Sequence, residues 1–432
     1  MLQTIYTIPD HVFGLPLFGF GLLLGLWAIG SLVLLAWLAW RQGFNDDTRS
    51  YLPILLVLGA VVYWVLPALA EENHGLPIRG YGVMLFLGVV GGTALTVWRG
   101  YRLGLDPDMV MSLIFWGFIP GIIGARTYYV VEYWNDFLVP GATPWQTFIH
   151  SLGEIVNISK GGLVVYGSLV GGLAGFLAYT LRKRLPLWAT LDLLAPGMLL
   201  GLALGRIGCF MNGCCFGGPC DLPWAVQFPA GSPPYVRQVQ EGELFVHGLK
   251  FHRDPMAPPV IAAVEPGSPA ERQELKPGQT IRSIDGKPVT TVHAAEKMLL
   301  DAEQPGEELT VVTVEGPRAA QWEVTRPLPR GEPIHPTQLY GAIGALLLCL
   351  FLLAYDPFAR RDGELIALLL TLYPINRFLL ECIRTDEPGV FGTPLDTGQV
   401  VSLMALAAAA GLWWHVLRRQ PGRAFAASAG PA

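Results

Sequence analysis

The chain has 432 residues, a formal net charge of −5, and a composition that is 52% hydrophobic and only 15% charged. Its mean hydropathy of +0.43 excludes an ordinary soluble protein of this length. The basic residues are scattered along the chain, so nothing supports nucleic acid as a partner. These properties predict an all-α polytopic membrane protein.

Apolar runs long enough to cross a bilayer recur along the chain and predict about nine transmembrane helices. They lie at residues 12–40, 51–70, 80–99, 109–133, 161–182, 188–212, 336–356, 363–383 and 398–418. The first run is too long for a signal-peptide core, so we expect it to be retained. Basic residues follow the odd-numbered runs, and the positive-inside rule therefore places the N-terminus outside and the C-terminus in the cytoplasm.

Residues 213–333, between the sixth and seventh runs, carry charged residues, prolines and alternating apolar positions but no spanning run. We expect an inserted α+β domain outside the cytoplasm. Asp285-Gly286 predicts a hairpin turn within it. The expected elements are strands at 259–264 and 280–284, a helix at 293–302 and a strand at 308–314.

This order of elements, with Pro-Gly-Ser-Pro-Ala at 266–270 and Leu-Lys-Pro-Gly at 275–278, resembles a PDZ domain of bacterial envelope proteases. The carboxylate-binding loop of that family corresponds to Gly248, Leu249, Lys250 and Phe251. PDZ domains bind extended peptides by adding a strand to a sheet edge, so the resemblance implies an envelope peptide as partner. The alternative is a packing module that binds nothing.

Arginines stand late in the fourth, sixth and eighth runs, at Arg126, Arg206 and Arg377. These three runs point outward in the expected topology, so all three guanidinium groups should lie in the outer half of the membrane. A charge there costs several kcal/mol unless it has a partner, and guanidinium groups suit phosphate. We therefore expect a phospholipid headgroup as ligand. The alternatives are arginines that reach to the membrane surface and, for Arg377, a local ion pair with Glu381.

Four of the six cysteines crowd into one stretch, at Cys209, Cys214, Cys215 and Cys220. A disulfide is allowed outside the cytoplasm and is the leading expectation. Free thiols or apolar fillers come second. A metal site is the least favoured alternative, because spacings of five, one and five do not form the two C-x-x-C arms of a zinc site.

Motifs around these residues resemble, in the same order, those of the prolipoprotein diacylglyceryl transferase family. They lie at residues 124–129, 161–167, 205–217, 335–340 and 377–384. The resemblance covers 77–228 and 333–418. It implies an additional N-terminal hairpin at 1–76, a core in two parts at 77–228 and 333–420, an insert at 229–332 with its PDZ-like part at about 245–328, and a cytoplasmic tail at 421–432.

The resemblance implies transfer of a diacylglyceryl group from phosphatidylglycerol to the lipobox cysteine of prolipoprotein signal peptides. Glycerol 1-phosphate would be released at the outer leaflet of the bacterial inner membrane, and no cofactor would be needed. By match with the family, Arg126 and Arg206 would bind phosphate and Tyr81 would line the lipid site. The remaining phospholipid-binding candidates are Asn212, Tyr340, Arg377, Glu381 and Arg384.

The family usually has a histidine, the favoured base, where Tyr166 stands. An unperturbed tyrosine, with a pKa of about 10, is a poor base at neutral pH, so His335 is the first candidate and Tyr166 the second. The chain also departs from the family at Cys209, Cys214 and Ile334. Two other functions therefore stay open: a non-catalytic lipid-binding scaffold that recruits peptides, and a membrane thiol-disulfide enzyme.

Overall fold

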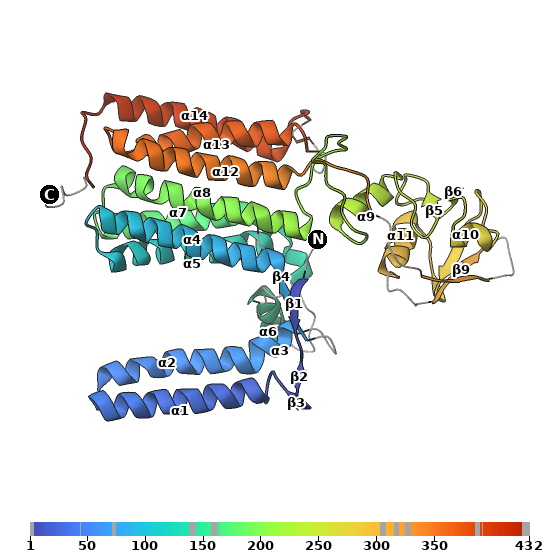
Figure 1. The fold of residues 1–432 in the computed structure, drawn as a ribbon, viewed down its shortest axis with the longest axis horizontal. Coiled ribbons are helices and arrows are strands. Elements are labelled where there is room, and N and C mark those ends of the chain that lie inside the picture. Colours follow the sequence, from blue (N-terminus) through green and yellow to red (C-terminus); the bar gives the residue numbers. More distant parts are fainter. Residues whose placement is uncertain are drawn as a thin grey trace. The chain divides into compact units, whose positions relative to one another are not determined.

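The computed structural model describes residues 4–425 apart from 44, 71–74, 138–143, 157–161, 163, 303–307, 315–318, 325–329, 385–388 and 391 (Figure 1). The chain is mostly helical and divides into two compact units. The first unit contains residues 202–348 and 370–411. The second contains residues 2–201, 349–369 and 412–432.

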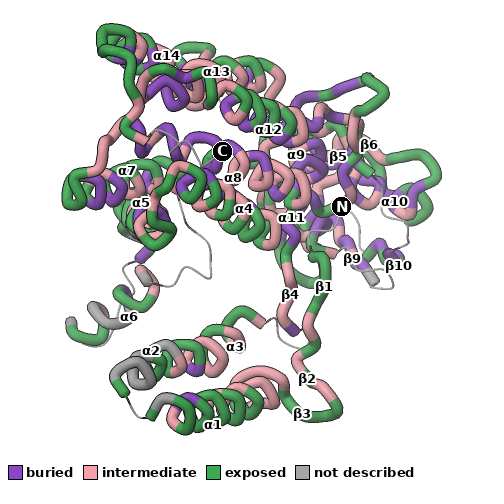
Figure 2. Tube along the Cα trace, turned by 60° about the vertical axis from the view of Figure 1, so that its left-hand side comes forward, coloured by how far each residue is buried: buried purple, intermediate pink, exposed green. Residues whose placement is uncertain are grey.

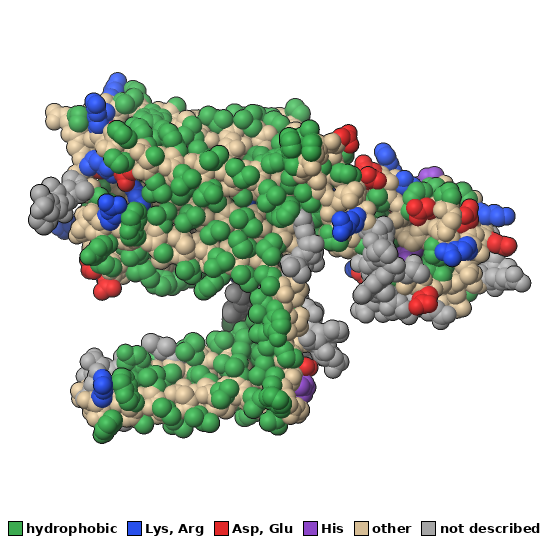
Figure 3. All heavy atoms as spheres, viewed as in Figure 1, with side chains coloured by type: hydrophobic (Ala, Val, Ile, Leu, Met, Phe, Trp, Pro, Cys, Tyr) green, Lys and Arg blue, Asp and Glu red, His purple; other side chains and the backbone are tan. Residues whose placement is uncertain are grey.

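Seven helices within the described residues are long and apolar enough to cross a membrane. Six of them are α1 (Leu22–Gln42), α4 (Gly80–Arg102), α5 (Pro107–Glu132), α8 (Leu187–Asn212), α12 (Thr337–Tyr355) and α14 (Thr397–Arg418). The seventh, Tyr51–Leu69, joins α2 (Asp46–Ala60), a π-helical turn and α3 (Leu66–Leu69). Hydrophobic side chains cover the visible face of these helices (Figure 3). The prediction of a polytopic membrane protein is confirmed.

Two of the expected spans, α7 (Val165–Arg182) and α13 (Glu364–Glu381), form 18-residue helices outside that set. Glu364, Arg377 and Glu381 lower the hydropathy of α13. Glycine and tyrosine residues dilute the apolar character of α7. The expected number of spans is therefore not confirmed, although each expected span corresponds to a helix.

Helices of the second unit approach one another at glycines, where the absence of a Cβ lets two backbones come close. A Cβ on Gly92 of α4 would lie 2.6 Å from the carbonyl oxygen of Gly197 in α8. A Cβ on Gly171 of α7 would overlap the carbonyl oxygen of Pro120 in α5. In the same unit, β1 (Thr4–Ile8) pairs antiparallel with β4 (Leu76–Arg79).

Two carboxylates of the second unit have specific partners. Asp192 of α8 is 1% exposed and accepts hydrogen bonds from the backbone N–H groups of Gly363 and Ile366, at 2.7 and 2.9 Å. Asp356 forms ion pairs of 2.7 Å with both Arg99 and Arg423. The carboxylates of Asp192 and Asp356 are therefore compensated, as a low-dielectric interior requires.

The insert lies in the first unit and has its own apolar core, where buried positions gather (Figure 2). Its strands and a short helix are β5 (Leu249–Phe251), β6 (Ile261–Val264), α10 (Pro269–Arg272), β7 (Ile281–Ile284), β8 (Lys287–Pro288), β9 (Glu308–Thr313) and β10 (Ala319–Glu323). One sheet has the order β10-β9-β7-β8 and a second pairs β5 with β6. The helices α9 (Pro233–Gln240) and α11 (Val292–Asp301) pack on this core.

The predicted order of strand, turn, helix and strand within the insert is observed. Asp285 and Gly286 have φ angles of 47° and 73°, and they connect β7 to β8 as a tight hairpin turn. The two ends of the insert pair with each other, since the N–H groups of Val226 and Ile334 each donate to the other's carbonyl at 3.1 Å. The insert is thus joined to the rest of the first unit by a short antiparallel stem.

Candidate active site

Arg206 lies near the C-terminal end of α8, where the apolar helix meets the loop that leads to the insert. Its guanidinium group is hydrogen-bonded to the side chain of Tyr373 on α13. A Cβ on Gly341 of α12 would lie 3.5 Å from the Cδ atom of Arg206, an ordinary contact distance, so α12 runs beside the arginine stem. Tyr373 was missed by the sequence analysis, although it precedes Arg377 by one helical turn.

A second group of cations surrounds Glu381 at the end of α13. The carboxylate of Glu381 is 0% exposed and forms ion pairs with Arg377 and, at 2.8 Å, with Arg384. A Cβ on Gly398 of α14 would lie 2.5 Å from Oε1 of Glu381, so the first turn of α14 closes tightly over the carboxylate. The local ion pair that the spacing allowed for Arg377 is therefore formed. Phospholipid binding by these three residues stays a prediction.

The loop after α8 turns back through left-handed backbone conformations. Gly213 has a φ of 80° and Cys215 a φ of 58°, which is unusual for a residue with a side chain. The amide of Gln338 donates to the carbonyl of Cys214, and the hydroxyl of Thr337 to that of Cys215, both at 2.7 Å. The start of α12 thus holds this loop in place.

The six cysteines are free thiols in the structure. The sulfur atoms of Cys209, Cys214 and Cys215 all lie within 4.8 Å of one another, and Cys220 is not among them. Hydrogen bonds from the thiols of Cys209 and Cys214 hold the pKa of the Cys215 thiol below its usual range, although burial opposes them. The nearby guanidinium groups of Arg206 and Arg384 add to this effect.

His335 lies beside the same loop, just before α12. Its carbonyl accepts from the N–H of Gly217 at 3.1 Å, and its own N–H donates to Gly218 at 3.0 Å. A Cβ on Gly217 would lie 2.6 Å from the Cβ of His335, so only glycine fits there. The imidazole Nδ1 lies 3.3 Å from the hydroxyl of Tyr340, which also accepts a hydrogen bond of 2.7 Å from the indole of Trp224.

Arg126 belongs to the second unit, where its guanidinium group contacts backbone carbonyls. Its nitrogen atoms donate to the carbonyls of Glu154 and Ile155, at the C-terminal end of α6 (Pro144–Val156), and to that of Gly162, at 2.7 to 3.0 Å. Tyr81 and Tyr166 lie in the same unit and are each 40% exposed. Convergence of the three arginines on one headgroup stays a prediction.

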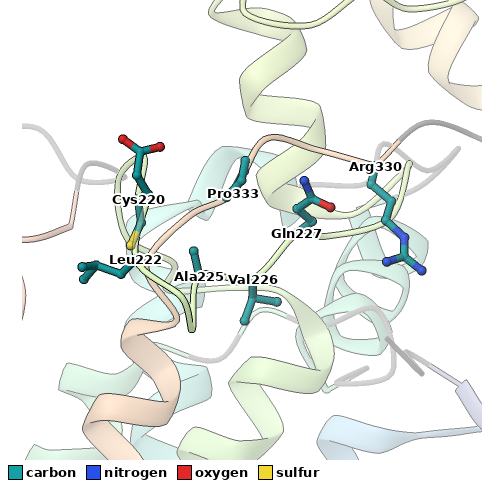
Figure 4. A pocket seen from close by; sticks show the side chains of 8 residues that line it. Cys220, Leu222, Ala225, Val226, Gln227, Arg330 and Pro333 are labelled. Atoms are coloured by element: carbon teal, nitrogen blue, oxygen red, sulfur yellow. The ribbon is translucent and has the colours of Figure 1, made fainter.

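A pocket of about 570 Å³ opens beside the stem of the insert (Figure 4). Its polar lining comes from Asp221, Gln227 and Arg330. Cys220 also lines it. The sequence analysis missed this pocket, because its walls come from the two ends of the insert. Close by, Ile334 is 3% exposed in a small apolar cluster with Phe216 and Phe228, which suits an aliphatic residue at this position.

The loop expected to bind peptides contains Gly248, whose φ of 81° and lack of a Cβ let it approach Ser268. The next residues form β5, which pairs with β6, and Leu249 of β5 also forms an antiparallel bridge with Val246. Leu249 and Phe251 point into the core, being 0% and 4% exposed. Lys250 instead lies over the ring of Phe245, with its ammonium nitrogen 4.9 Å from the ring centroid.

The family model of prolipoprotein diacylglyceryl transferase matches residues 67–415. The chain is 32% identical over 444 residues to the phosphatidylglycerol–prolipoprotein diacylglyceryl transferase of Rhodopirellula baltica, and this alignment covers 94% of the chain and 88% of the relative. It is 24% identical over 335 residues to the enzyme of that name from Clostridium tetani, and this alignment covers 78% of the chain and 92% of the relative. It is 36% identical over 168 residues to the enzyme of that name from Leifsonia xyli subsp. xyli, and this alignment covers 39% of the chain and 50% of the relative. The chain belongs to the prolipoprotein diacylglyceryl transferase family.

Proposed function

We propose that this chain transfers a diacylglyceryl group from phosphatidylglycerol to the cysteine thiol of a prolipoprotein signal peptide. Membership in the family supports this function, as does the match over most of the chain to the phosphatidylglycerol–prolipoprotein diacylglyceryl transferase of Rhodopirellula baltica. The structural observation that carries it is Arg206, a cation at the end of an apolar helix beside Tyr373. The enzyme would be a multi-pass protein of the inner membrane, with its insert and N-terminus outside the cytoplasm.

In the proposed reaction the thiol sulfur forms a bond to the glyceryl carbon, and the C–O bond to phosphate breaks. Glycerol 1-phosphate leaves with the bonding electrons. Arg206 would neutralise the charge that builds on this phosphate, a contribution that is largest in the transition state. The ion-paired group around Glu381 would hold Arg377 and Arg384 in fixed positions at the edge of the lipid site.

His335 is the proposed acceptor of the thiol proton. Base catalysis needs the tautomer in which Nδ1–H donates to the hydroxyl of Tyr340, because the lone pair on Nε2 can then take the proton. Trp224 donates to the same hydroxyl and thereby holds Tyr340 in place. Tyr166 is the alternative base, and loss of activity in Tyr166→Phe with full activity in His335→Gln would reverse the assignment.

The insert would present prolipoproteins or other envelope peptides to this site. Gly248 has a left-handed conformation just before β5, which pairs with β6 along one edge. At the other edge the N–H and the carbonyl of Leu249 bond to Val246, at 2.8 and 2.9 Å, so a PDZ-like mode of strand addition would displace this turn. A scaffold without activity would show the same peptide binding, so the transfer assay separates the two functions.

The full chain in detergent, given phosphatidylglycerol and a lipobox peptide, should attach diacylglycerol to the peptide cysteine, whereas a Cys→Ser peptide should not react. Arg206→Ala should abolish transfer, and Arg206→Lys should restore only part, because a point charge cannot reproduce a guanidinium fork. Arg237→Ala is the matched control, since Arg237 forms an exposed ion pair on α9. Full activity in Arg206→Ala would remove Arg206 from the site. No transfer by the wild type would favour the scaffold function.

A further inference from the structure

We propose that Cys209, Cys214 and Cys215 form a three-sulfur site for a soft, thiophilic metal cation such as Cu(I), Zn(II) or Cd(II). Their three sulfur atoms lie within 4.8 Å of one another in the structure. Thiolate ligands select cations of this class. The consequence for catalysis, given below, rests on the proposed transferase function.

The spacing of the three sulfur atoms is compatible with a metal ion. Three sulfurs around one metal, each with a bond of about 2.3 Å, are separated by about 4 Å. Contraction of less than about 1 Å would bring these three thiols to that separation. A disulfide needs two sulfurs at about 2 Å and leaves the third thiol unused.

The backbone around the site is held before any ligand arrives. Cys215 adopts a left-handed φ of 58°, a conformation that costs about 1 kcal/mol or more for a residue with a side chain. Thr337 and Gln338 fix the carbonyls of Cys215 and Cys214. Cys209 comes from the last turns of α8, so the site joins a rigid helix to a fixed loop.

The charges around the three sulfurs also suit a thiolate complex. Each thiol that binds a metal releases its proton to solvent, so a divalent ion with three thiolates has a net charge of −1 and a monovalent ion −2. The guanidinium groups of Arg206 and Arg384 act on Cys215 and would offset this charge. A loaded site would therefore compete with phosphate for Arg206, and the metal would inhibit the transferase.

The test uses the full chain in detergent, reduced and without oxygen, titrated with Cd²⁺ as the probe. The wild type should show an ultraviolet thiolate-to-cadmium charge-transfer band that saturates at one ion per chain. Cys209→Ser, Cys214→Ser and Cys215→Ser should each weaken binding by more than about tenfold. Cys220→Ser is the matched control from the same stretch and should keep the band.

Gln338→Ala provides a variant that retains every cysteine. It removes the hydrogen bond to the carbonyl of Cys214 and should weaken Cd²⁺ binding by about tenfold. Wild-type protein without the band, or equal loss of the band in Cys220→Ser and Cys214→Ser, would overturn the site. A disulfide among the three thiols that persists under the reducing conditions would also overturn it.

A second measurement tests inhibition. Transfer by the wild type should fall when Cd²⁺ is added and return with a chelator, whereas the ratio of activities with and without Cd²⁺ should stay near one in Cys214→Ser. Equal inhibition in both proteins would refute the link to Arg206. The absorption titration contains no substrate, so absence of transfer by metal-free protein would count against the proposed function and not against the metal site.

Discussion

Replacing Glu381 with glutamine should destabilise the protein strongly while leaving the shape of the side chain almost unchanged. The carboxylate is 0% exposed, and its partners Arg377 and Arg384 are 19% and 4% exposed. The substitution removes the negative charge that both cations contact, and Arg384 has almost no access to water. Breaking a buried ion pair in this way costs about 3–5 kcal/mol.

Heat unfolding of the full chain in detergent, at one fixed scan rate, provides the assay. A loss of this size should lower the midpoint by about 3–6 °C in a chain of this length. Glu241→Gln is the matched control, because Glu241 pairs with Arg237 at 2.7 Å but the two side chains keep 47% and 32% of their surface in contact with solvent. Exposed pairs contribute less than about 1 kcal/mol, so this variant should unfold close to the wild type.

Gly398→Ala tests the same carboxylate without changing any charge. The new Cβ would lie 2.5 Å from Oε1 of Glu381, so the carboxylate must move away from its partners. We expect a midpoint between those of the wild type and Glu381→Gln. Equal midpoints for Glu381→Gln and Glu241→Gln would refute the reasoning, since they would show that the buried cations find compensation elsewhere.

Further predictions concern the insert and the loop below it. Burial raises the pKa of Glu296 from 4.5 to about 7, so the carboxyl group holds its proton more tightly in the folded than in the unfolded chain. The insert should therefore lose about 3 kcal/mol of stability between pH 5 and 8, measured by hydrogen exchange of α11. Glu296→Gln should abolish this loss. Deleting residues 230–329 and joining Pro229 to Arg330, which form a bridge, with a short linker should leave a monodisperse protein that modifies a short lipobox peptide. An aggregated product would show that the insert supports the membrane core. Gly217→Ala should displace His335 and lower kcat by about tenfold or more. Gly205→Ala is the control and should match the wild type, because no heavy atom lies within 4 Å of its new Cβ. Equal kcat values for Gly217→Ala and the wild type would place His335 outside the reaction.

The secondary structure of the insert could be predicted from sequence because its signals are local. Alternating apolar residues gave the strands, and Asp285-Gly286 gave the turn that the positive φ angles confirm. The core of the insert was harder to delimit. Tyr235 and Val239 of α9 belong to it, although α9 precedes the predicted start of the PDZ-like part at about 245. Which helix packs on a sheet depends on the chain path, which local patterns do not encode.

The polar contacts of the site could be predicted only where the partners are close in sequence. Arg377 and Glu381 are one helical turn apart, so their ion pair was among the alternatives. The partners of Arg126 were not predictable, because they are carbonyls of a segment that returns to the helix after about thirty residues. The cluster of the three thiols was not predictable either, because their spacing in the sequence resembles no metal motif. Their sulfur atoms come together only because Gly213 and Cys215 turn the chain back.

The loop after α8 connects the groups on which the proposals depend. Its Cys214 and Cys215 carbonyls accept hydrogen bonds from side chains at the start of α12. Its Gly217 and Gly218 form backbone hydrogen bonds with His335. The N–H of Gly218 also donates to the carbonyl of Ile383 at 2.9 Å, next to Arg384. A ligand that draws the three sulfurs together must therefore pull on the backbone that positions both the histidine and the arginine. For this reason metal binding at the cysteines should alter transfer even without touching the substrate.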